Sequence, residues 1–597
     1  MIQEITNFID EIPESVFSYH LTLDEGLYIF VELDNNGNLT ETETRLYKKD
    51  AELDSFFDRC LTLQTKVKPV APSKIFNPIK KIFGGSCSGF ALCFNKKNVY
   101  KDKILRSDEI NVSLVEYFKG AEKYILQENE NHVVWFSKFK LFCCNNLIAF
   151  LQDLPEYTSL KDNSSVNIFL NEPSIEDFQK LYDPYVANSV FNKDDYKTEL
   201  ERVIYNIADS LSSFSEKKMF WRHKTAPFEF NYKITGEQAK KIWQFFNIRG
   251  RVLPNPLPIF IDKKELNKDV IRVVNEDKKL SYSEIIKKIF PNNDNGADLG
   301  NYYLLFFQKG ELVDLDFVPS YHYLIDDMFI FELFSIGGKQ EKRITNLFEF
   351  ESHVANRIFN GQLITKTNAG GWWLKYFGDI EYNPKYLSDN TYNQLLKYRK
   401  SFYDYIYKAK RESIQSFMFH DIMLKGILDD LRTDEYKDRN HTKDFSIKEK
   451  LNIWFSLFYY FDKNLNNTES MASRILEHQE KMRDLISGTY NLKENEDDDM
   501  FAFATGQVIY YLFSKSETSD RSYGRLEAFL QKKECGTLQA TLFNTFNMYK
   551  HKPFSNNFRK PFAEVMDYKT STNISTLMPT ILAGFFSDNT LFADTND

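Results

Sequence analysis

The stretch Leu395–Leu428, LLKYRKSFYDYIYKAKRESIQSFMFHDIMLKGIL, shows most clearly how the second half of this chain folds. Large or apolar side chains recur in it at steps of three and four residues: Leu395, Tyr398, Phe402, Ile406 and Ala409, then Ile414, Phe417, Leu424 and Leu428. Because an α-helix repeats every 3.6 residues, this spacing places them on one face. The pattern predicts one long amphipathic helix.

Helical signals continue from this stretch to the C-terminus. A polar segment at 432–444 interrupts the pattern, and Ser446-Ile447-Lys448-Glu449 has the form of a capping box that opens a helix running to Phe461. The acidic run at 494–499 predicts a linker that ends at a helix N-terminus, where negative charge is favourable. Asn466-Asn467-Thr468 is expected to cap a helix that ends near Gly488, and further helices are expected at about 500–515, 522–533, 536–550, 556–568 and 574–586.

The first half of the chain shows strand patterns instead. Leu27–Leu33 and the segment 39–47 flank Asn35-Asn36-Gly37-Asn38, and Asn-Gly supplies the positive φ of a tight hairpin turn. A second hairpin is predicted from 302–307 and 312–317. Shorter strands are expected at 89–94 and 166–170, and helices at 109–128 and 195–212.

These patterns predict an α+β fold. We expect a mixed region with β-hairpins and helices at residues 1–350, followed by an all-α helical bundle at 351–597. The length of 597 residues suggests about three to five domains. Apolar residues at 42% and charged residues at 27% exclude global disorder and rod-like folds.

Charge and cysteine usage narrow the cellular setting. The net charge of −9 argues against a uniformly basic polyanion binder, although a local basic face is compatible with it. Six scattered cysteines form no C-x-x-C pair, so neither a disulfide framework nor a zinc site is predicted. No stretch approaches the ~18 apolar residues of a membrane span, and no secretory signal is recognisable. A cytoplasmic protein without a membrane partner is therefore expected.

The common catalytic and cofactor motifs are absent from the sequence. Gly337-Gly338-Lys339 lacks the spacing and the following hydroxyl residue of a phosphate-binding loop, and no G-x-G-x-x-G, H-E-x-x-H or G-x-S-x-G occurs. His420-Asp421 stands without further histidine ligands, so ordinary helix polarity is the favoured interpretation. The sequence predicts no metal, no cofactor and no catalytic residue.

Local basic patches favour a polyanionic partner. In the first half, a Gly-rich loop between lysines is typical of close backbone approach to a phosphate, although a plain turn into a strand is the alternative. The candidate residues there are Lys80, Lys81, Gly84, Gly85, Ser86, Lys96, Lys97, Arg222, Lys224, Arg249 and Arg251. Segment 521–560 holds eight basic residues against Glu527 and Glu534, a net charge of +6. Its candidates are Arg521, Arg525, Lys532, Lys533, Lys550, Lys552, Arg559 and Lys560.

An ordered series of short motifs near the C-terminus resembles one family. The motifs are Ala504-Thr505-Gly506-Gln507-Val508-Ile509-Tyr510-Tyr511-Leu512, Leu526-Glu527-Ala528-Phe529-Leu530, Tyr549-Lys550-His551, Asn557-Phe558-Arg559, Val565-Met566-Asp567-Tyr568 and Leu582-Ala583-Gly584-Phe585-Phe586-Ser587. Together they look like the end of the Csh-type large subunit of type I-B CRISPR effector complexes (Cascade). The resemblance is specific over the last ~85 residues and looser over the rest of the chain.

The resemblance implies a non-catalytic subunit that contacts the 5′ handle of the CRISPR RNA, recognises the PAM duplex and stabilises opened target DNA. Its implied partners are CRISPR RNA, target double-stranded DNA, the backbone, handle-binding and small Cascade subunits, and the helicase–nuclease. It also implies internal initiation within the large-subunit gene. Met471, at the start of a capped helix, is the candidate start and would give a small-subunit-like bundle at 471–597, although an ordinary helix-face residue is the alternative. Two alternatives stay open: a cryptic metal-dependent nuclease, and a helical interaction protein that binds no nucleic acid.

Overall fold

The computed structural model describes residues 2–592, apart from 14–21, 49–50, 72, 77–81, 103, 192–196, 202, 208–232, 249–252, 263, 277–280, 290–298, 310, 337–340, 368–371, 463–470 and 519–520. It forms two compact units, 1–280 with 309–311, and 281–308 with 312–597. The predicted change from mixed to helical structure near residue 350 therefore lies inside the second unit. The strands at 324–330 and 342–346, which precede that point, belong to the same compact unit as the C-terminal helices.

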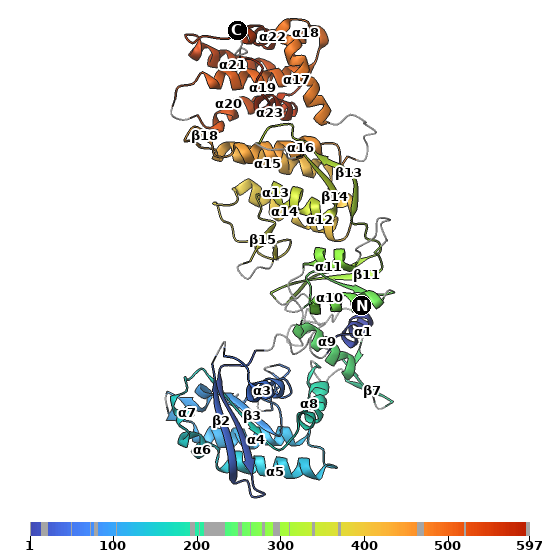
Figure 1. The fold of residues 1–597 in the computed structure, drawn as a ribbon, viewed down its shortest axis with the longest axis vertical. Helices are drawn as coiled ribbons and strands as arrows, with labels where there is room; N and C mark the ends of the chain where they lie inside the picture. Colours follow the sequence, from blue (N-terminus) through green and yellow to red (C-terminus); the bar gives the residue numbers. More distant parts are fainter. Residues whose placement is uncertain are drawn as a thin grey trace, which may run out of the picture. The chain divides into compact units, whose positions relative to one another are not determined.

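The core of the first unit is a four-stranded sheet of order β2-β1-β6-β3 (Figure 1). Its strands are β1 (Gly26–Leu33), β2 (Leu39–Tyr47), β3 (Ala91–Asn95) and β6 (Ser165–Leu170). Strand β1 pairs antiparallel with β2 and parallel with β6, and β3 pairs antiparallel with β6. Nearly every side chain of β1 and β6 is buried, as expected for the two central strands of a sheet. The predicted first hairpin and both short strands are confirmed.

Helices pack around this sheet and continue beyond it. The helices of the first unit are α1 (Ile2–Asp10), α3 (Ser55–Thr65), η1 (Lys96–Val99), α4 (Ser107–Glu122), α5 (Glu130–Asn145), α6 (Leu147–Asp153), α7 (Pro155–Ser159), α8 (Ile175–Ser189), α9 (Gly236–Ile248) and α10 (Lys264–Glu276). The remaining strands are β4 (Tyr100–Lys101), β5 (Ile104–Leu105), β7 (Thr198–Leu200), β8 (Val203–Asn206), β9 (Ile234–Thr235) and β10 (Leu257–Phe260).

The prediction of a helix at 195–212 is wrong for its described part. Strands β7 and β8 form an antiparallel hairpin there, and Glu201 adopts a positive φ of 50° in the turn. Val203, Ile204 and Tyr205 are β-branched or aromatic, and such side chains favour strands once a partner strand is present.

The second unit begins with a mixture of helices and hairpins. Its elements up to the middle of the chain are α11 (Tyr282–Ile289), β11 (Tyr302–Gln308), β12 (Glu311–Val318), β13 (Leu324–Ile330), β14 (Lys342–Asn346), α12 (Leu347–Phe350), the π-helix η4 (Glu351–Ala355), α13 (Asn356–Ile358), β15 (Ile364–Lys366) and β16 (Trp372–Leu374). Strands β11 and β12 are neighbours in one sheet, which confirms the second predicted hairpin.

Helices dominate the chain after residue 388. They are α14 (Asp389–Tyr407), η5 (Arg411–Ser413), α15 (Ser416–Thr433), α16 (Asp444–Ser456), α17 (Met471–Ser487), α18 (Leu492–Asn495), α19 (Asp498–Ser514), η6 (Tyr523–Leu526), α20 (Glu527–Leu530), α21 (Cys535–Tyr549), α22 (Asn556–Asp567), η7 (Ile574–Thr576) and α23 (Met578–Phe586). The predicted helical C-terminal region is confirmed. It is not all-α from residue 351, because β15–β16 and the short pair β17 (Tyr436–Lys437) and β18 (Asn440–His441) interrupt it.

The single long helix predicted for 395–428 is two helices, α14 and α15, packed against each other. The chain turns at Ala409, whose φ is 49°. The neighbouring Lys408 is buried, and its ammonium lies 2.8–3.1 Å from carboxylates of Asp314, Asp316 and Asp404. The predicted face is the buried face only in α14, which buries Leu395, Tyr398, Phe402 and Ile406. Helix α15 instead buries Met418, Phe419, Ile422 and Met423, and leaves Phe417 66% exposed.

The predicted capping box at Ser446 is also wrong. Helix α16 begins two residues earlier, at Asp444, and ends at Ser456. The Ser446 hydroxyl instead donates to Asp430 of α15 at 2.7 Å, and Lys450 donates to the same carboxylate at 2.5 Å. The Ser446 hydroxyl therefore bonds to a side chain of another helix, whereas the sequence pattern predicted that it would cap its own helix.

A carboxyl group is buried in the second unit. Glu351 accepts a hydrogen bond from the Tyr376 hydroxyl at 2.5 Å, and Tyr407 also bonds to it. Burial raises the pKa of Glu351 to about 7, against the lowering effect of these two hydroxyls. The carboxyl is therefore partly protonated at neutral pH.

Helix α19 is the central helix of the C-terminal region, and it contacts α17, α21, α22 and α23 (Figure 1). Its closest contact is with α23, where a Cβ on Gly506 would lie 2.2 Å from the Ile581 carbonyl oxygen. A Cβ on Gly584 would meet the Phe503 carbonyl oxygen at 2.0 Å. The Gln507 amide donates to Gly584 O at 2.6 Å. These glycines allow two helix backbones to touch.

No single helix in the described part of the chain has the length and apolar character needed to cross a membrane. The helices α5 and α6 pass that test only as a pair, across a bend of 66°.

Candidate nucleic-acid interface

The Gly-rich loop at 84–90 lies inside the first unit. Ser86 is fully buried, shares a hydrogen bond of 2.8 Å with the Tyr117 hydroxyl and accepts one of 2.9 Å from the Cys93 amide. Gly84 and Gly85 are half-buried, and a Cβ on Gly85 would lie 2.6 Å from the Cys93 carbonyl oxygen. The glycine therefore permits close packing of the loop on β3.

Three residues of this loop, Gly85, Cys87 and Ser88, use their amides within the protein. Gly85 N donates to Cys93 O at 2.9 Å, Cys87 N donates to Val67 O at 2.6 Å, and Ser88 N donates to the Tyr117 hydroxyl at 3.3 Å. A phosphate cradle needs free amides that point to a common anion. The expected role of this loop as a phosphate cradle is thus not supported, and internal packing explains its glycines.

Lys96 and Lys97 are adjacent but have different environments. The Lys96 ammonium is buried and donates to the carbonyl oxygens of Tyr157, Thr158 and Leu160 at 2.7, 3.2 and 2.8 Å, around the end of α7. Burial lowers the pKa of Lys96, and the Asp162 carboxylate opposes that effect. Lys97 is exposed. Only Lys97 of this pair is available to a phosphate.

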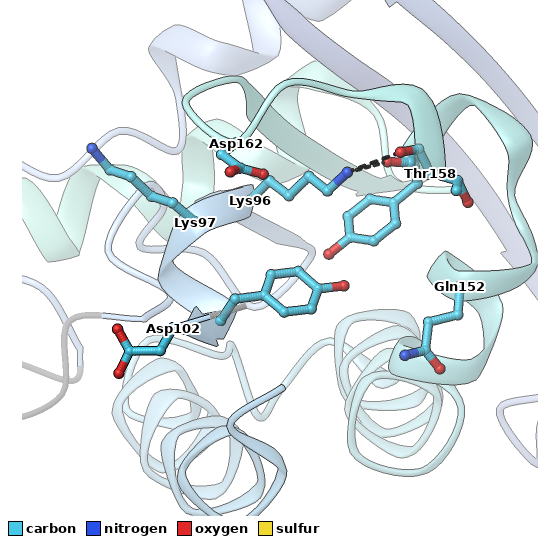
Figure 2. A pocket seen from close by; sticks show the side chains of 8 residues that line it. Lys96, Lys97, Asp102, Gln152, Thr158 and Asp162 are labelled. Carbon is cyan, nitrogen blue, oxygen red and sulfur yellow. Dashed lines mark hydrogen bonds between the residues drawn. The ribbon is translucent and has the colours of Figure 1, made fainter. Parts of the chain in front are cut away.

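Both lysines border a pocket of about 640 Å³ in the first unit. Figure 2 shows the Lys96 side chain directed toward Thr158, whereas Lys97 points away from it. The lining residues are Lys96, Lys97, Tyr100, Asp102, Gln152, Tyr157, Thr158 and Asp162. Burial raises the pKa of Tyr157, so its hydroxyl stays protonated. The pocket is lined by acidic as well as basic side chains, and the Lys96 ammonium already donates to three carbonyl oxygens. This pocket is therefore not an anion site.

Six of the N-terminal candidates lie outside the described residues: Lys80, Lys81, Arg222, Lys224, Arg249 and Arg251. They stay predictions.

Two of the eight C-terminal cations, Arg525 and Lys552, are half-buried and have side-chain partners within the protein. Arg525 donates to the Tyr549 hydroxyl at 3.1 Å, and its guanidinium carbon lies 4.4 Å from the centre of the Phe513 ring. Lys552 forms an ion pair with Glu517. These two cations serve packing, and the sequence pattern did not distinguish them from the others.

The other six C-terminal cations are more open. Arg521 is exposed and donates to the Thr518 carbonyl oxygen at 3.3 Å. Across the described part of the chain, the remaining five make no ion pair with a carboxylate: Lys532, Lys533, Lys550, Arg559 and Lys560. All of them except the half-buried Lys532 are exposed. They are therefore free to neutralise an external anion.

The elements that carry these cations pack together. Lys532 and Lys533 follow α20, Lys550 follows α21, and Arg559 and Lys560 lie near the start of α22. Helices α20 and α21 are in contact. Rings of Phe546 and Phe562 stack at 4.8 Å between α21 and α22. The structure thus brings these cations onto contacting helices, as a surface for an extended polyanion requires.

His420 and Asp421 have structural partners. The His420 Nδ1 accepts a hydrogen bond from the Trp454 indole at 2.7 Å, and Asp421 pairs with Lys425 at 2.8 Å. Among the described residues, no group of three or more His, Cys, Asp or Glu side chains is arranged to hold a metal ion. All six cysteines are free thiols.

Met471, the expected internal start, is the first residue of α17 and is buried.

An exposed aromatic pair was not among the residues predicted from the sequence. Trp372 and Trp373 are 50% and 47% exposed on strand β16. Two consecutive tryptophans after Gly370-Gly371, with lysines on both sides, are a readable signal, because tryptophan contributes strongly to the energetics of interfaces.

Comparison with protein-family models and with curated proteins found no match for this chain.

Proposed function

We propose that this chain is the non-catalytic large subunit of a type I-B CRISPR RNA-guided surveillance complex, and that it acts in the cytoplasm in antiviral defence. The observation that carries the proposal is the set of exposed, unpaired cations on contacting C-terminal helices of a chain with net charge −9. Like charges repel when they are gathered, so folding alone gives no reason to collect them. A phosphate backbone removes that repulsion and releases counterions.

The family resemblance supports the specific assignment. Its motif residues Gly506, Gln507 and Gly584 form the close crossing of α19 and α23, so the shared motifs describe a packing core. The motif residues Lys550 and Arg559 lie on its surface. Proteins that share this packing core would also hold the surface cations in the same places. The family motifs and the basic residues therefore occur in one region of the chain.

In this proposal the C-terminal cations hold the sugar–phosphate backbone of opened target DNA without reading bases. The first unit contacts the CRISPR RNA handle and the PAM duplex, with Lys97 as its described candidate cation. Residues 471–597 act as a small-subunit-like bundle. The backbone, handle-binding and small subunits and the helicase–nuclease are the proposed protein partners.

The test is charge reversal on the full-length chain in its assembled complex. The variant carries Lys532→Glu, Lys533→Glu, Lys550→Glu and Arg559→Glu. Affinity for correctly flanked DNA should fall about equally for all target sequences, and the slope of log affinity against log salt should flatten by up to about 4. A PAM preference that persists agrees with backbone contact.

A matched control reverses four exposed lysines elsewhere, Lys119, Lys123, Lys161 and Lys309, and produces the same change in net charge. If both variants lose equal affinity, the C-terminal cations have no special role. Binding that does not depend on salt would favour the interaction-protein alternative. Cleavage of DNA by the purified chain that requires added Mg²⁺ or Mn²⁺ would favour the nuclease alternative.

A further inference from the structure

The strands β15 and β16 form a two-stranded antiparallel ribbon that carries two exposed tryptophans. Its register pairs Ile364 with Leu374, Thr365 with Trp373, and Lys366 with Trp372. Cross-strand partners share a face of such a ribbon, and consecutive residues of one strand point to opposite faces. Trp372 and Trp373 therefore lie on opposite faces, and neither can cover the other.

Each indole has a lysine ammonium over its ring. The Nζ of Lys366 lies 5.1 Å from the centre of the Trp372 ring, and the Nζ of Lys375 lies 5.2 Å from the centre of the Trp373 ring. A cation within about 6 Å of a ring centre is attracted to the ring face. Since each tryptophan is still about half exposed, a large part of each ring remains open to an external group.

The base of the ribbon is held firmly. The Asn356 side chain accepts from Ile364 N at 3.0 Å and donates to Ile364 O at 3.3 Å. On the other strand, the Arg399 guanidinium donates to the carbonyl oxygens of Lys375 and Gly378 at 3.2 and 2.6 Å. The Asn356 side chain of α13 and the Arg399 side chain of α14 thus hold one end of the ribbon in place. The exposed rings lie on a ribbon that is anchored by hydrogen bonds at that end.

The charges around the rings decide what kind of partner fits. Residues 361–378 contain two lysines and no Asp or Glu. Lysine is depleted in protein–protein interface cores, whereas aromatic rings interleaved with lysines are typical of surfaces that bind unpaired nucleic acid. A nucleobase offers a flat π face to the open side of an indole, and its phosphate offers a negative charge to the exposed Lys366.

We infer that the β15–β16 ribbon is a binding site for single-stranded nucleic acid, in which Trp372 and Trp373 each stack on a base. Lys366 contacts the backbone, while the buried Lys375, held by Gln362 Oε1 at 3.3 Å, orients the Trp373 ring. Stacking on a ring is tolerant of sequence, so the site binds without base preference. The inference rests on the proposed function only in that the ligand is a nucleic acid, and it adds a second site remote in sequence from the C-terminal cations.

The test uses the full-length protein with a fluorescently labelled oligo(dT). The Trp372→Ala and Trp373→Ala variants should each weaken binding about tenfold, and the salt slope should stay unchanged because a lost ring releases no counterion. The conservative Trp372→Phe and Trp373→Phe variants should retain most of the affinity. Phe417→Ala, which removes a ring that is 66% exposed on α15, is the matched control and should bind as the wild type does.

A second measurement covers the case in which an alanine variant loses the ribbon itself. Ultraviolet crosslinking of a 5-bromodeoxyuridine oligonucleotide to the wild-type chain should give adducts at Trp372 and Trp373, located by mass spectrometry. Wild-type affinity in the alanine variants, or crosslinks confined to other residues, would overturn the inference and leave the rings to a protein partner. Because the C-terminal charge reversal alters the salt slope and these variants do not, failure of the two proposals is distinguishable.

Discussion

Replacement of Gly506 by alanine should destabilise the C-terminal region. A Cβ at this position would lie 2.2 Å from Ile581 O and 2.6 Å from Phe585 N, whereas real contacts begin near 3.0 Å. Helices α19 and α23 would have to separate by roughly 1 Å, which strains the hydrogen bond from Gln507 to Gly584. Overpacking costs about 1–3 kcal/mol and a lost hydrogen bond about 1 kcal/mol, against a gain of about 0.5–1 kcal/mol in helix propensity.

The net expectation for Gly506→Ala is a loss of about 2–3 kcal/mol. Hydrogen exchange of the α19 amides is the suitable assay, since it reports this region separately from the rest of a long chain. Exchange should accelerate about 30- to 160-fold.

Gly536→Ala provides the matched control. Gly536 lies in α21, is exposed, and has no atom within 4 Å of the position that a Cβ would take. Alanine there should stabilise the helix by up to about 1 kcal/mol. If Gly506→Ala proved as stable as Gly536→Ala, the close crossing of α19 and α23 would be refuted.

Three other predictions follow from single groups. Burial raises the pKa of Glu351 from 4.5 to about 7. The protonated carboxyl therefore makes its full contribution to the free energy of unfolding below pH 4.5, and that contribution is lost as the pH rises through 7. Urea unfolding should show a fall of roughly 3 kcal/mol over this range that Glu351→Gln lacks, and an identical pH profile in the variant would disprove the shift. Lys96→Met should lower the thermal midpoint of the first unit without weakening nucleic-acid binding, whereas Lys97→Met should leave the midpoint unchanged; a midpoint unaffected by Lys96→Met would mean that its three carbonyl contacts are dispensable. Mass spectrometry of the purified complex should detect a chain that begins at or near Met471, and a functional complex that contains only full-length chain would contradict internal initiation.

Local patterns predicted much of the secondary structure correctly. The turn around Gly37 and the alternation on both sides of it predicted β1 and β2, because a positive φ and a period of two leave few alternatives. Helices α19, α21 and α22 were predicted to within two residues, since their apolar spacing is uninterrupted. The acidic run at 494–499 is a linker only at residues 496–497, because 494–495 belong to α18 and 498–499 to α19. The expected negative charge at a helix N-terminus is confirmed, since Asp497 accepts from Met500 N as the N-cap of α19.

Side-chain partners distant in sequence explain the failures. The break at Ala409 depends on carboxylates that come from β12, nearly a hundred residues earlier, as well as on Asp404 of α14. The hydroxyl of Ser446 is taken by Asp430. Nothing in the spacing of either segment carries that information, because periodicity records which face is buried and not what buries it.

For the candidate interface, too, some features follow from the sequence and others only from the tertiary structure. The sequence by itself determined that lysines and arginines gather near the C-terminus of an acidic chain, since composition needs no fold. Only the tertiary structure decided which of them are free, because Arg525 and Lys552 meet Tyr549 and Glu517 only after folding. The same is true of Lys96, which resembles Lys97 in sequence and differs from it because the carbonyl oxygens at the end of α7 surround one ammonium and not the other.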